Sequence, residues 1–161
     1  MTQAKKKTPE SSRVRLHQWM LPEHANALGN VHGGTIMKLV DEAGAIAAMR
    51  HAQRRCVTIA VDSMIFREPV HLGALLVCDA RVTYVGRSSI ETSVLVHSEN
   101  PITGELTHTN SAHLVYIALG DDDRPTAVPP LELETDADRL AFEQGALRQQ
   151  ERLARKQREG N

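Results

Sequence analysis

Residues 29–45 read Gly-Asn-Val-His-Gly-Gly-Thr-Ile-Met-Lys-Leu-Val-Asp-Glu-Ala-Gly-Ala. From Thr35 to about His51, apolar residues recur at the three-and-four spacing of an α-helix, and most positions between them are small rather than charged. A helix with so few charged positions is buried over most of its surface. The stretch therefore predicts a central, buried helix that begins at the glycine pair Gly33-Gly34.

Segments on both sides of this helix alternate apolar and polar residues with period two, which is typical of half-buried strands. These segments cover residues 13–20, 56–66, 74–85, 88–98 and 105–119. In the third of them, Val82 and Tyr84 are expected on one face of the sheet and Thr83 on the other. The joins between the later segments are short and rich in turn-forming residues, which indicates antiparallel hairpins.

One long helix and several long antiparallel strands pack most economically when a curved sheet wraps around the helix. The sequence therefore predicts an α+β protein with the hot-dog fold. We expect a disordered basic tail at residues 1–12, the hot-dog domain at 13–124, and a Pro-containing linker with a C-terminal helix at 125–161. The second half of that helix, residues 148–158, is dense in charge, so we expect it to fray or to cover a neighbouring subunit.

The composition argues against several classes of protein. A formal net charge of -1 over 161 residues disfavours a nucleic-acid partner, which needs a clear excess of Lys and Arg. No run approaches the roughly 20 apolar residues of a membrane span, so we expect a cytoplasmic protein without a membrane partner. Cys56 and Cys78 lie in strand-like runs without metal-ligand spacing, and the histidines form no cluster, so we expect no metal and no cofactor.

Asp41 is the most unusual residue of the central helix, because it places a carboxylate within the apolar pattern. Its neighbours on the same helix face are mainly small, which leaves room for a ligand. Burial would favour protonation of such a group and so suit it to general-base work. The alternative is a buried carboxylate that caps backbone groups or pairs across an interface. Glu42, one residue further on, points about 100° away and is expected to pair with Lys38.

The start of the helix offers hydrogen-bond donors. Gly33 and Gly34 let the backbone approach a ligand closely, and the free N–H groups of a first helical turn can polarise a carbonyl oxygen. Asn30 could orient water or a carbonyl through its amide, or simply satisfy backbone groups at the helix entry. His32 lacks a carboxylate at an obvious spacing to orient it, so a turn role is favoured over a role as base.

Four blocks of the chain resemble the cytosolic acyl-CoA hydrolase family of hot-dog thioesterases. They are residues 29–45, 61–70, 85–91 and 96–100. The resemblance implies hydrolysis of a fatty acyl-CoA to free CoA and a carboxylic acid, at a site formed between two hot-dog domains. It implies that Asp41 activates water or attacks the thioester, that Asn30 contributes from the facing domain, and that the glycine-rich helix start binds the thioester carbonyl.

The resemblance also implies a site for CoA and an oligomer. Arg87, Ser88 and Ser89 on a hairpin turn are the first candidates for binding the CoA phosphates, followed by Arg67 and the pair Arg54-Arg55. Vertebrate relatives carry two such domains in tandem, whereas this chain has one, so we expect a homodimer or a higher assembly such as a trimer of dimers.

Two other functions remain open from the sequence. A hot-dog hydratase or dehydratase would use a His together with an Asp, and no His stands at a clear spacing from Asp41. A non-catalytic acyl-CoA sensor would use the same cleft for binding alone, and such a regulator normally brings a DNA-binding segment, which neither tail shows.

Overall fold

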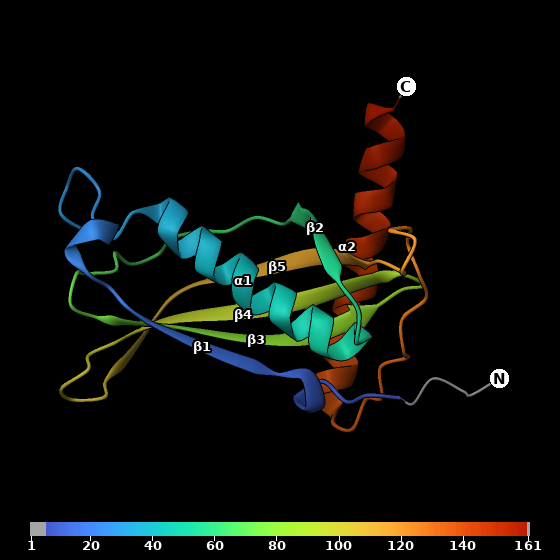
Figure 1. The fold of residues 1–161 in the computed structure, drawn as a ribbon, viewed down its shortest axis with the longest axis horizontal. Coiled ribbons are helices and arrows are strands. Elements are labelled where there is room, and N and C mark those ends of the chain that lie inside the picture. The colour runs from blue at the N-terminus through green and yellow to red at the C-terminus, as the bar shows by residue number, and fades with distance from the viewer. Residues whose placement is uncertain (1–5, 161) are drawn as a thin grey trace.

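The computed structural model describes residues 6–160. Within this range the chain forms five strands and two long helices (Figure 1). Their order is β1 (Val14–Trp19), α1 (Gly33–Ala52), β2 (Cys56–Val61), β3 (Leu75–Val85), β4 (Ser89–Glu99), β5 (Leu106–Ala118) and α2 (Asp136–Glu159). Two short 3-10 helices, η1 (Glu10–Ser12) and η2 (Pro22–His24), flank β1.

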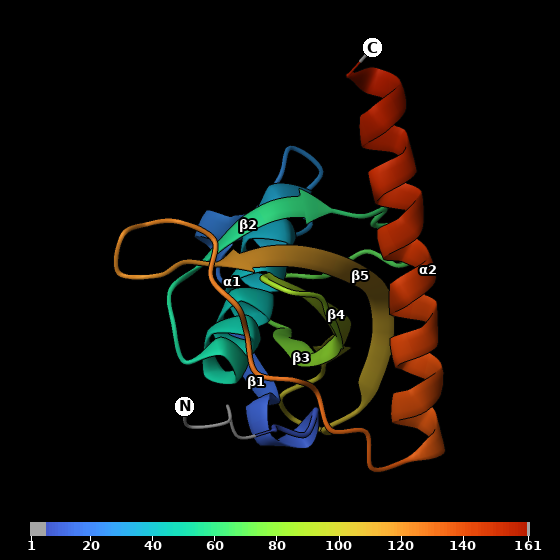
Figure 2. The same ribbon diagram turned by 90° about the vertical axis from the view of Figure 1, so that its right-hand side faces the viewer.

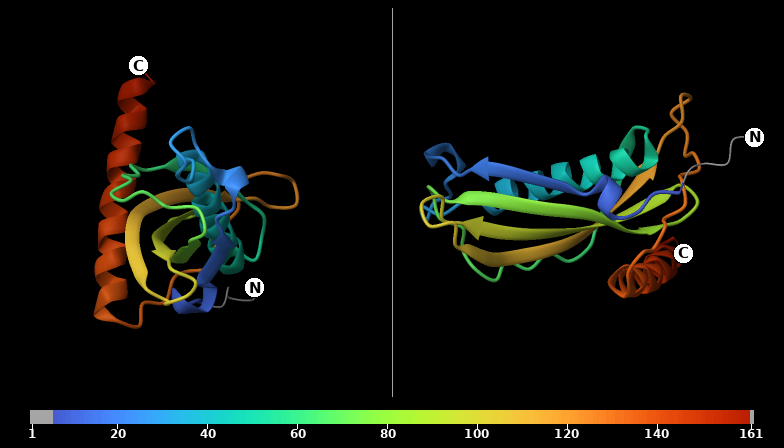
Figure 3. Two further views of the ribbon diagram at one scale, coloured as in Figure 1. Left: turned by 90° about the vertical axis from the view of Figure 1, so that its left-hand side faces the viewer. Right: turned by 90° about the horizontal axis from the view of Figure 1, so that it is seen from below.

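The strands form one antiparallel sheet in the order β1-β3-β4-β5-β2. The sheet curls strongly, with α1 in its concave side and α2 against its convex side (Figures 2 and 3). The predicted α+β hot-dog architecture is therefore confirmed. Because the apolar stripe of α1 faces the sheet, the core consists of small and aliphatic side chains from both, among them Val40, Ala43, Ala47, Leu76, Val94 and Val96, all fully buried.

Two segments differ from the sequence-based prediction: the N-terminal segment, residues 1–12, and the strand that follows α1. Residues 1–5 of the expected disordered tail lie outside the described residues, whereas the rest of that segment is structured. Lys7 forms a parallel bridge with Leu131, and Ser12 is fully buried. Strand β2 ends at Val61 rather than at residue 66, and the chain then leaves the sheet as a loop that returns toward the start of α1.

A β-bulge shifts the expected alternation in β3. The register against β4 changes between Val82 and Tyr84. As a result Val82 and Thr83 are both buried, and the Tyr84 ring lies 4.9 Å from the Phe142 ring of α2. Tyr84 therefore packs on the convex side and not on the core side with Val82, as the simple alternation predicted, because a bulge adds one residue to the strand and reverses the faces beyond it.

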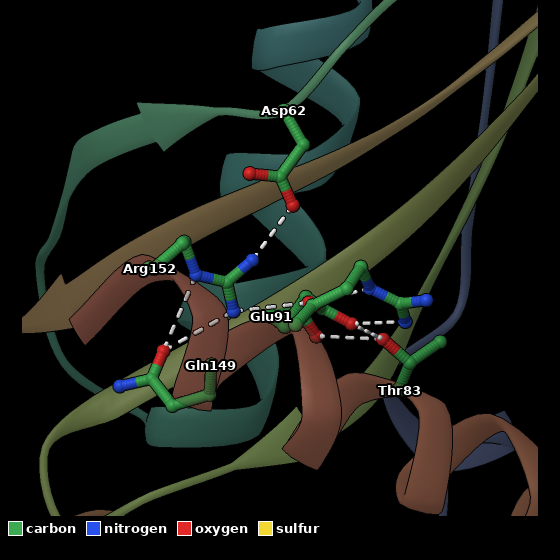
Figure 4. A network of polar contacts seen from close by, with 6 residues as sticks. Asp62, Thr83, Glu91, Gln149 and Arg152 are labelled. Atoms are coloured by element: carbon green, nitrogen blue, oxygen red, sulfur yellow. Dashed lines mark hydrogen bonds and ion pairs between the residues drawn. The ribbon is translucent and has the colours of Figure 1, made fainter. Parts of the chain in front are cut away.

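Helix α2 is held to the sheet by ion pairs with the buried Glu91 and the partly buried Asp62 (Figure 4). Its N-cap is Thr135, whose side chain accepts from the Asp138 amide, and the Asp138 side chain accepts from the Thr135 amide in return. Further along, Arg148 donates two hydrogen bonds to the fully buried Glu91 of β4, at 2.7 and 3.0 Å. Arg152 donates to Glu91 at 3.1 Å and to Asp62 at 2.6 Å. The sequence predicts that residues 148–158 fray or cover a neighbouring subunit, whereas Arg148 and Arg152 of this segment are bonded to their own chain.

None of the helices in the described range is long and apolar enough to cross a membrane.

Candidate active site

Asp41 lies in the middle of α1, and two hydroxyl groups hold one of its carboxylate oxygens. Thr58 of β2 donates to Oδ1 at 2.8 Å, and the Tyr116 hydroxyl of β5 lies 3.2 Å from the same oxygen. The single Tyr116 hydroxyl proton is shared between this oxygen and the Asp41 backbone oxygen, which lies 3.0 Å from the hydroxyl. Among the described residues, nothing donates to Oδ2. The carboxylate is therefore anchored through one oxygen, while the other is available to a water molecule or substrate.

The sheet register brings the two hydroxyl donors together. Thr58 and Tyr116 stand directly opposite each other in the antiparallel β2–β5 ladder, so their side chains lie on the same face, beneath α1. Helix α1 crosses this face with Asp41 above the pair. Neither partner of Asp41 is a histidine. The site thus offers a carboxylate with two neutral donors.

The first turn of α1 is organised around His32. The His32 ring accepts a hydrogen bond from the Gly34 amide at 2.9 Å through Nδ1, which makes His32 the N-cap of the helix. This is the turn role that the sequence favoured. The Gly34 amide is consequently occupied, whereas the Gly33 amide has no acceptor among the described residues. Of the two glycine donors considered from the sequence, Gly33 is the one left free.

A cavity of about 310 Å³ opens beside this first turn. Its walls include Asn26, Asn30, Gly33, Phe66 and Arg67. The structure therefore brings three of the predicted site residues, Asn30, Gly33 and Arg67, to one cavity. Phe66 packs beside Gly33, where a Cβ at position 33 would lie in ordinary van der Waals contact with its ring, at 3.6 Å.

Two asparagines shape the loop before α1, and their side chains differ in their partners. The Asn26 Oδ1 accepts hydrogen bonds from the backbone amides of Leu28 and Asn30, at 2.9 and 3.2 Å. The Asn30 Oδ1 lies 3.1 Å from Nδ1 of His71. In both cases the oxygen is engaged within the chain, and the amide NH₂ group is the end left to meet a substrate.

Asp41 and Gly33 of one chain do not meet at a common point. Asp41 lies eight positions after Gly33 in the helix, which corresponds to about 12 Å along the helix axis. A carboxylate that activates water and an amide that binds the reacting carbonyl must both reach atoms about 3 Å away. One chain by itself therefore holds the two halves of the predicted chemistry apart.

The predicted CoA-binding residues on the hairpin turn lie at the opposite end of the sheet from the cavity. The turn between β3 and β4 is tied to the end of β5, since the Ser88 oxygen accepts from the Ala118 amide. Arg87 is exposed, Ser88 is half-buried and Ser89 is buried. Arg54 and Arg55 pair instead with Asp121 and Asp123, at 3.3 and 2.6 Å.

Other charged and titratable residues named from the sequence have the following surroundings. Glu42 lies 3.6 Å from the Lys38 ammonium group, as expected for residues four apart on an exposed helix face. Cys56 and Cys78 are free thiols, and burial raises the pKa of Cys56 to about 11 and that of Cys78 to about 12. In the described part of the chain, no three His, Cys, Asp or Glu side chains gather as metal ligands would.

A curved antiparallel sheet wrapped around a central helix defines a protein of the hot-dog fold. The sequence profile of the thioesterase superfamily matches residues 28–105. An uncharacterized acyl-CoA thioester hydrolase of Bacillus subtilis, YkhA, is 31% identical over 154 residues, which cover 92% of this chain and 90% of that protein. The mouse cytosolic acyl coenzyme A thioester hydrolase is 40% identical over 126 residues, 73% of this chain but only 33% of that protein.

Solved structures agree with these sequence matches. A hexameric acyl-CoA thioesterase superposes with a TM-score of 0.88 at 34% identity, covering 94% of this chain and 97% of that one. The acyl-CoA hydrolase of Staphylococcus aureus, solved with butyryl-CoA and CoA, superposes with a TM-score of 0.89 at 29% identity, covering 97% and 95%. The chain belongs to the acyl-CoA thioester hydrolase family of hot-dog proteins.

Proposed function

We propose that this chain hydrolyses acyl-CoA thioesters to free CoA and a carboxylic acid, with Asp41 as the reacting carboxylate. The observation that carries the proposal is the asymmetry of Asp41, whose Oδ1 is held by Thr58 and Tyr116 while its Oδ2 has no donor among the described residues. A carboxylate fixed in this way presents one oxygen in a defined direction. In a family of acyl-CoA thioester hydrolases, that oxygen is aimed at the thioester or at the water that attacks it.

The chemistry follows from this geometry in two alternative forms. As a general base, Oδ2 removes a proton from water while the water oxygen bonds to the thioester carbonyl carbon. As a nucleophile, Oδ2 bonds to that carbon itself, and water later cleaves the anhydride. In both forms the carbonyl oxygen becomes an oxyanion, the carbon–sulfur bond breaks, and the CoA thiolate leaves and takes up a proton.

We propose that the oxyanion is bound by the Gly33-Gly34 turn of a second copy of the chain. The separation of about 12 Å between Asp41 and Gly33 supports this two-chain site. The Gly33 amide is the donor, since His32 occupies the Gly34 amide. A two-fold dimer then contains two equivalent sites, each with Asp41 of one copy and the glycine turn of the other.

A loop asparagine of the same second copy supplies a side-chain amide in this proposal. Asn30 faces the cavity at the glycine turn, and so does Asn26. Alanine variants of the S. aureus hydrolase have been solved at an asparagine, at an aspartate 15 residues further on, and at a threonine 17 residues after that. The same spacings around Asp41 fall on Asn26 and Thr58, which supports Asn26 as the stronger candidate of the two asparagines.

We propose that CoA is bound by residues of both copies. Arg67 lines the cavity beside Gly33, where its guanidinium group suits a phosphate. Arg87, Ser88 and Ser89 lie at the opposite end of the sheet from this cavity, so in this proposal they come from the copy that supplies Asp41. We also propose a cytoplasmic location, because the mammalian relatives are named cytosolic.

The proposed assembly is a homodimer, and beyond it a trimer of dimers. Strand β2 is an edge of the sheet, and its apolar residues Val57, Ile59 and Val61 are all exposed. Exposed apolar side chains on a sheet edge are typical of a strand that pairs with another chain. Several structural neighbours, including the Yersinia pestis thioesterase, are named hexameric.

Release of free thiol from acyl-CoAs of graded chain length tests the proposed activity, in buffer with a chelator and without added metal. Turnover at one or more chain lengths supports it. Binding of acyl-CoA without hydrolysis at any length would contradict it and would indicate the non-catalytic sensor. Hydration of an enoyl-CoA, with no thiol released, would indicate the hydratase.

Single alanine variants distinguish the two loop asparagines. We expect Asn26→Ala to lower kcat by about 100-fold, the range found when one preorganised donor is removed from a reaction centre. Asn30→Ala serves as the matched control and is expected to lower kcat by less than about ten-fold. Steady-state kinetics should accompany melting temperatures, since Asn26 also holds two backbone amides. The reverse order of effects would assign the role to Asn30.

A further inference from the structure

Tyr116 is a fully buried residue beneath helix α1. Its side chain is among the largest with no exposed surface, and it projects from β5 into the concave side of the sheet. The hydroxyl lies 3.0 Å from the Asp41 backbone oxygen and 3.2 Å from Oδ1. The phenol therefore touches Asp41 at two points, on its backbone and on its carboxylate.

A glycine in α1 makes this approach possible. Gly44 lies three residues after Asp41, on the same face of the helix. A Cβ at position 44 would stand 2.4 Å from the Tyr116 hydroxyl oxygen and 2.8 Å from the Thr92 hydroxyl. Real Cβ atoms are not found so close to an oxygen, so any larger residue would push the phenol away from Asp41. Glycine is otherwise unfavourable within a helix, by about 1 kcal/mol relative to alanine.

The hydroxyl of Tyr116 acts as a donor under all ordinary conditions. Burial, followed by the adjacent Asp41 carboxylate, raises the pKa of Tyr116 above its ordinary value. A protonated phenol in a dry environment needs an acceptor, and Asp41 supplies it. Thr58 donates to the same Oδ1 from the more exposed side. The two donors together restrict rotation of the carboxylate about its side-chain bonds.

We propose that Tyr116 is a positioning residue for thioester hydrolysis, which acts with Thr58 to hold Oδ1 so that Oδ2 faces the substrate. The proposal rests on the proposed hydrolysis by Asp41. Tyr116 does not reach the reacting atoms itself, because it is fully buried and its hydroxyl contacts Oδ1 rather than Oδ2. Its effect is exerted through the orientation of Asp41, and it should therefore appear in turnover rather than in substrate binding.

The test compares Tyr116→Phe with Tyr84→Phe, since the chain contains two tyrosines. Both substitutions remove one hydroxyl and keep the ring. We expect Tyr116→Phe to lower kcat by about ten-fold, the loss that corresponds to one hydrogen bond to a charged group, with KM changed by less than about two-fold. Tyr84→Phe should leave both constants unchanged. A lower melting temperature with unchanged kcat in Tyr116→Phe would overturn the proposal and leave Tyr116 a purely structural role.

A double variant, Thr58→Val with Tyr116→Phe, shows whether the two hydroxyls act together on Asp41 or independently of each other. Thr58→Val retains one donor on Oδ1, and so does Tyr116→Phe, whereas the double variant has none. The loss of kcat in the double variant should therefore exceed the product of the two single losses by at least about three-fold. If the two single losses of kcat simply multiply in the double variant, Thr58 and Tyr116 affect turnover independently, and the proposal that they hold Asp41 together is contradicted.

A crystal structure of Tyr116→Phe supplies a readout that does not depend on turnover. The proposal expects Asp41 in more than one side-chain rotamer in this variant and in a single rotamer in the wild type. An Asp41 side chain that keeps its position on Thr58 would overturn it. If the wild-type protein releases no thiol from any acyl-CoA, the proposed function fails, and the rotamers of Asp41 still decide whether Tyr116 holds it.

Discussion

Asp41→Asn is expected to lower kcat for acyl-CoA hydrolysis by about 1,000-fold or more, while the protein folds and assembles as the wild type does. Asparagine has the shape of aspartate, and its Oδ1 can still accept from Thr58 and Tyr116. What changes is the other terminal atom, which becomes an NH₂ group that can neither accept a proton from water nor attack a carbonyl. Loss of a general base typically costs 100- to 10,000-fold in rate, about the range expected here.

The neighbouring residue provides a matched control for Asp41→Asn. Glu42 is the next residue of the helix, carries the same charge and pairs with Lys38 on an exposed face. Glu42→Gln should retain close to wild-type turnover, because an exposed ion pair contributes little to the fold and lies on another side of α1. Thiol release, gel filtration and melting temperature should be measured for all three proteins. Near wild-type turnover in Asp41→Asn would contradict the assigned role of this carboxylate.

Arg148→Ala is expected to produce a large loss of stability, of about 3 kcal/mol at neutral pH. The substitution removes the residue that donates two hydrogen bonds to Glu91, whose side chain has no exposed surface. A buried charge that loses its main partner typically costs 3–5 kcal/mol, and Arg152 and Thr83, which still donate to Glu91, favour the lower end. Denaturant unfolding at a fixed protein concentration measures this effect.

The same variant should show a characteristic dependence on pH. Burial alone would raise the pKa of Glu91, but hydrogen bonds from Arg148 and Thr83 outweigh burial and hold the pKa below its ordinary value of 4.5. A carboxyl group with a lowered pKa in the folded protein adds stability above its unfolded pKa, and this stability is lost as the pH falls through the folded pKa. The difference between wild type and Arg148→Ala should therefore be largest near neutral pH, where Glu91 is ionised in both proteins, and should shrink as the pH falls and Glu91 becomes protonated.

Arg155→Ala on the same helix is the control for this experiment. Arg155 is exposed, and its replacement should change the free energy of unfolding by less than about 0.5 kcal/mol. An Arg148→Ala protein that is as stable as this control would mean that Glu91 is satisfied by Arg152 and Thr83 alone.

The fold could be predicted from residue patterns because apolar residues recur with helical spacing in α1 and with period two in the strands. The buried character of α1 and the alternation of the long strands were sufficient to predict a sheet wrapped around a helix. The errors arose where the faces of a strand depend on pairing rather than on local sequence. Tyr84 changes sides because of a bulge against β4, and nothing in residues 74–85 by themselves shows that bulge.

The candidate site could be predicted only in part, for a related reason. Asp41 was identifiable because a carboxylate is out of place on an apolar helix face. Thr58 and Tyr116 were missed, since a threonine and a tyrosine in alternating strands look like ordinary strand residues. Their role depends on being opposite each other in the β2–β5 ladder, and a sequence does not show strand register. The arginines of α2 were missed similarly, because a charge-rich helix gives no sign of the buried Glu91 that it meets.

The distance along α1 between Gly33 and Asp41 has a consequence for how such proteins can evolve. Under the proposed two-chain site, a symmetric dimer of this chain must keep both half-sites intact in a single gene, because any damaging mutation appears in both active sites at once. Joining two copies in one polypeptide removes this constraint. Each copy of a fused pair can then lose a different half-site, so that one complete site survives and the other is released to change. A fused pair of domains can therefore lose one of its two sites and keep the other, which a symmetric dimer of a single-domain chain cannot do.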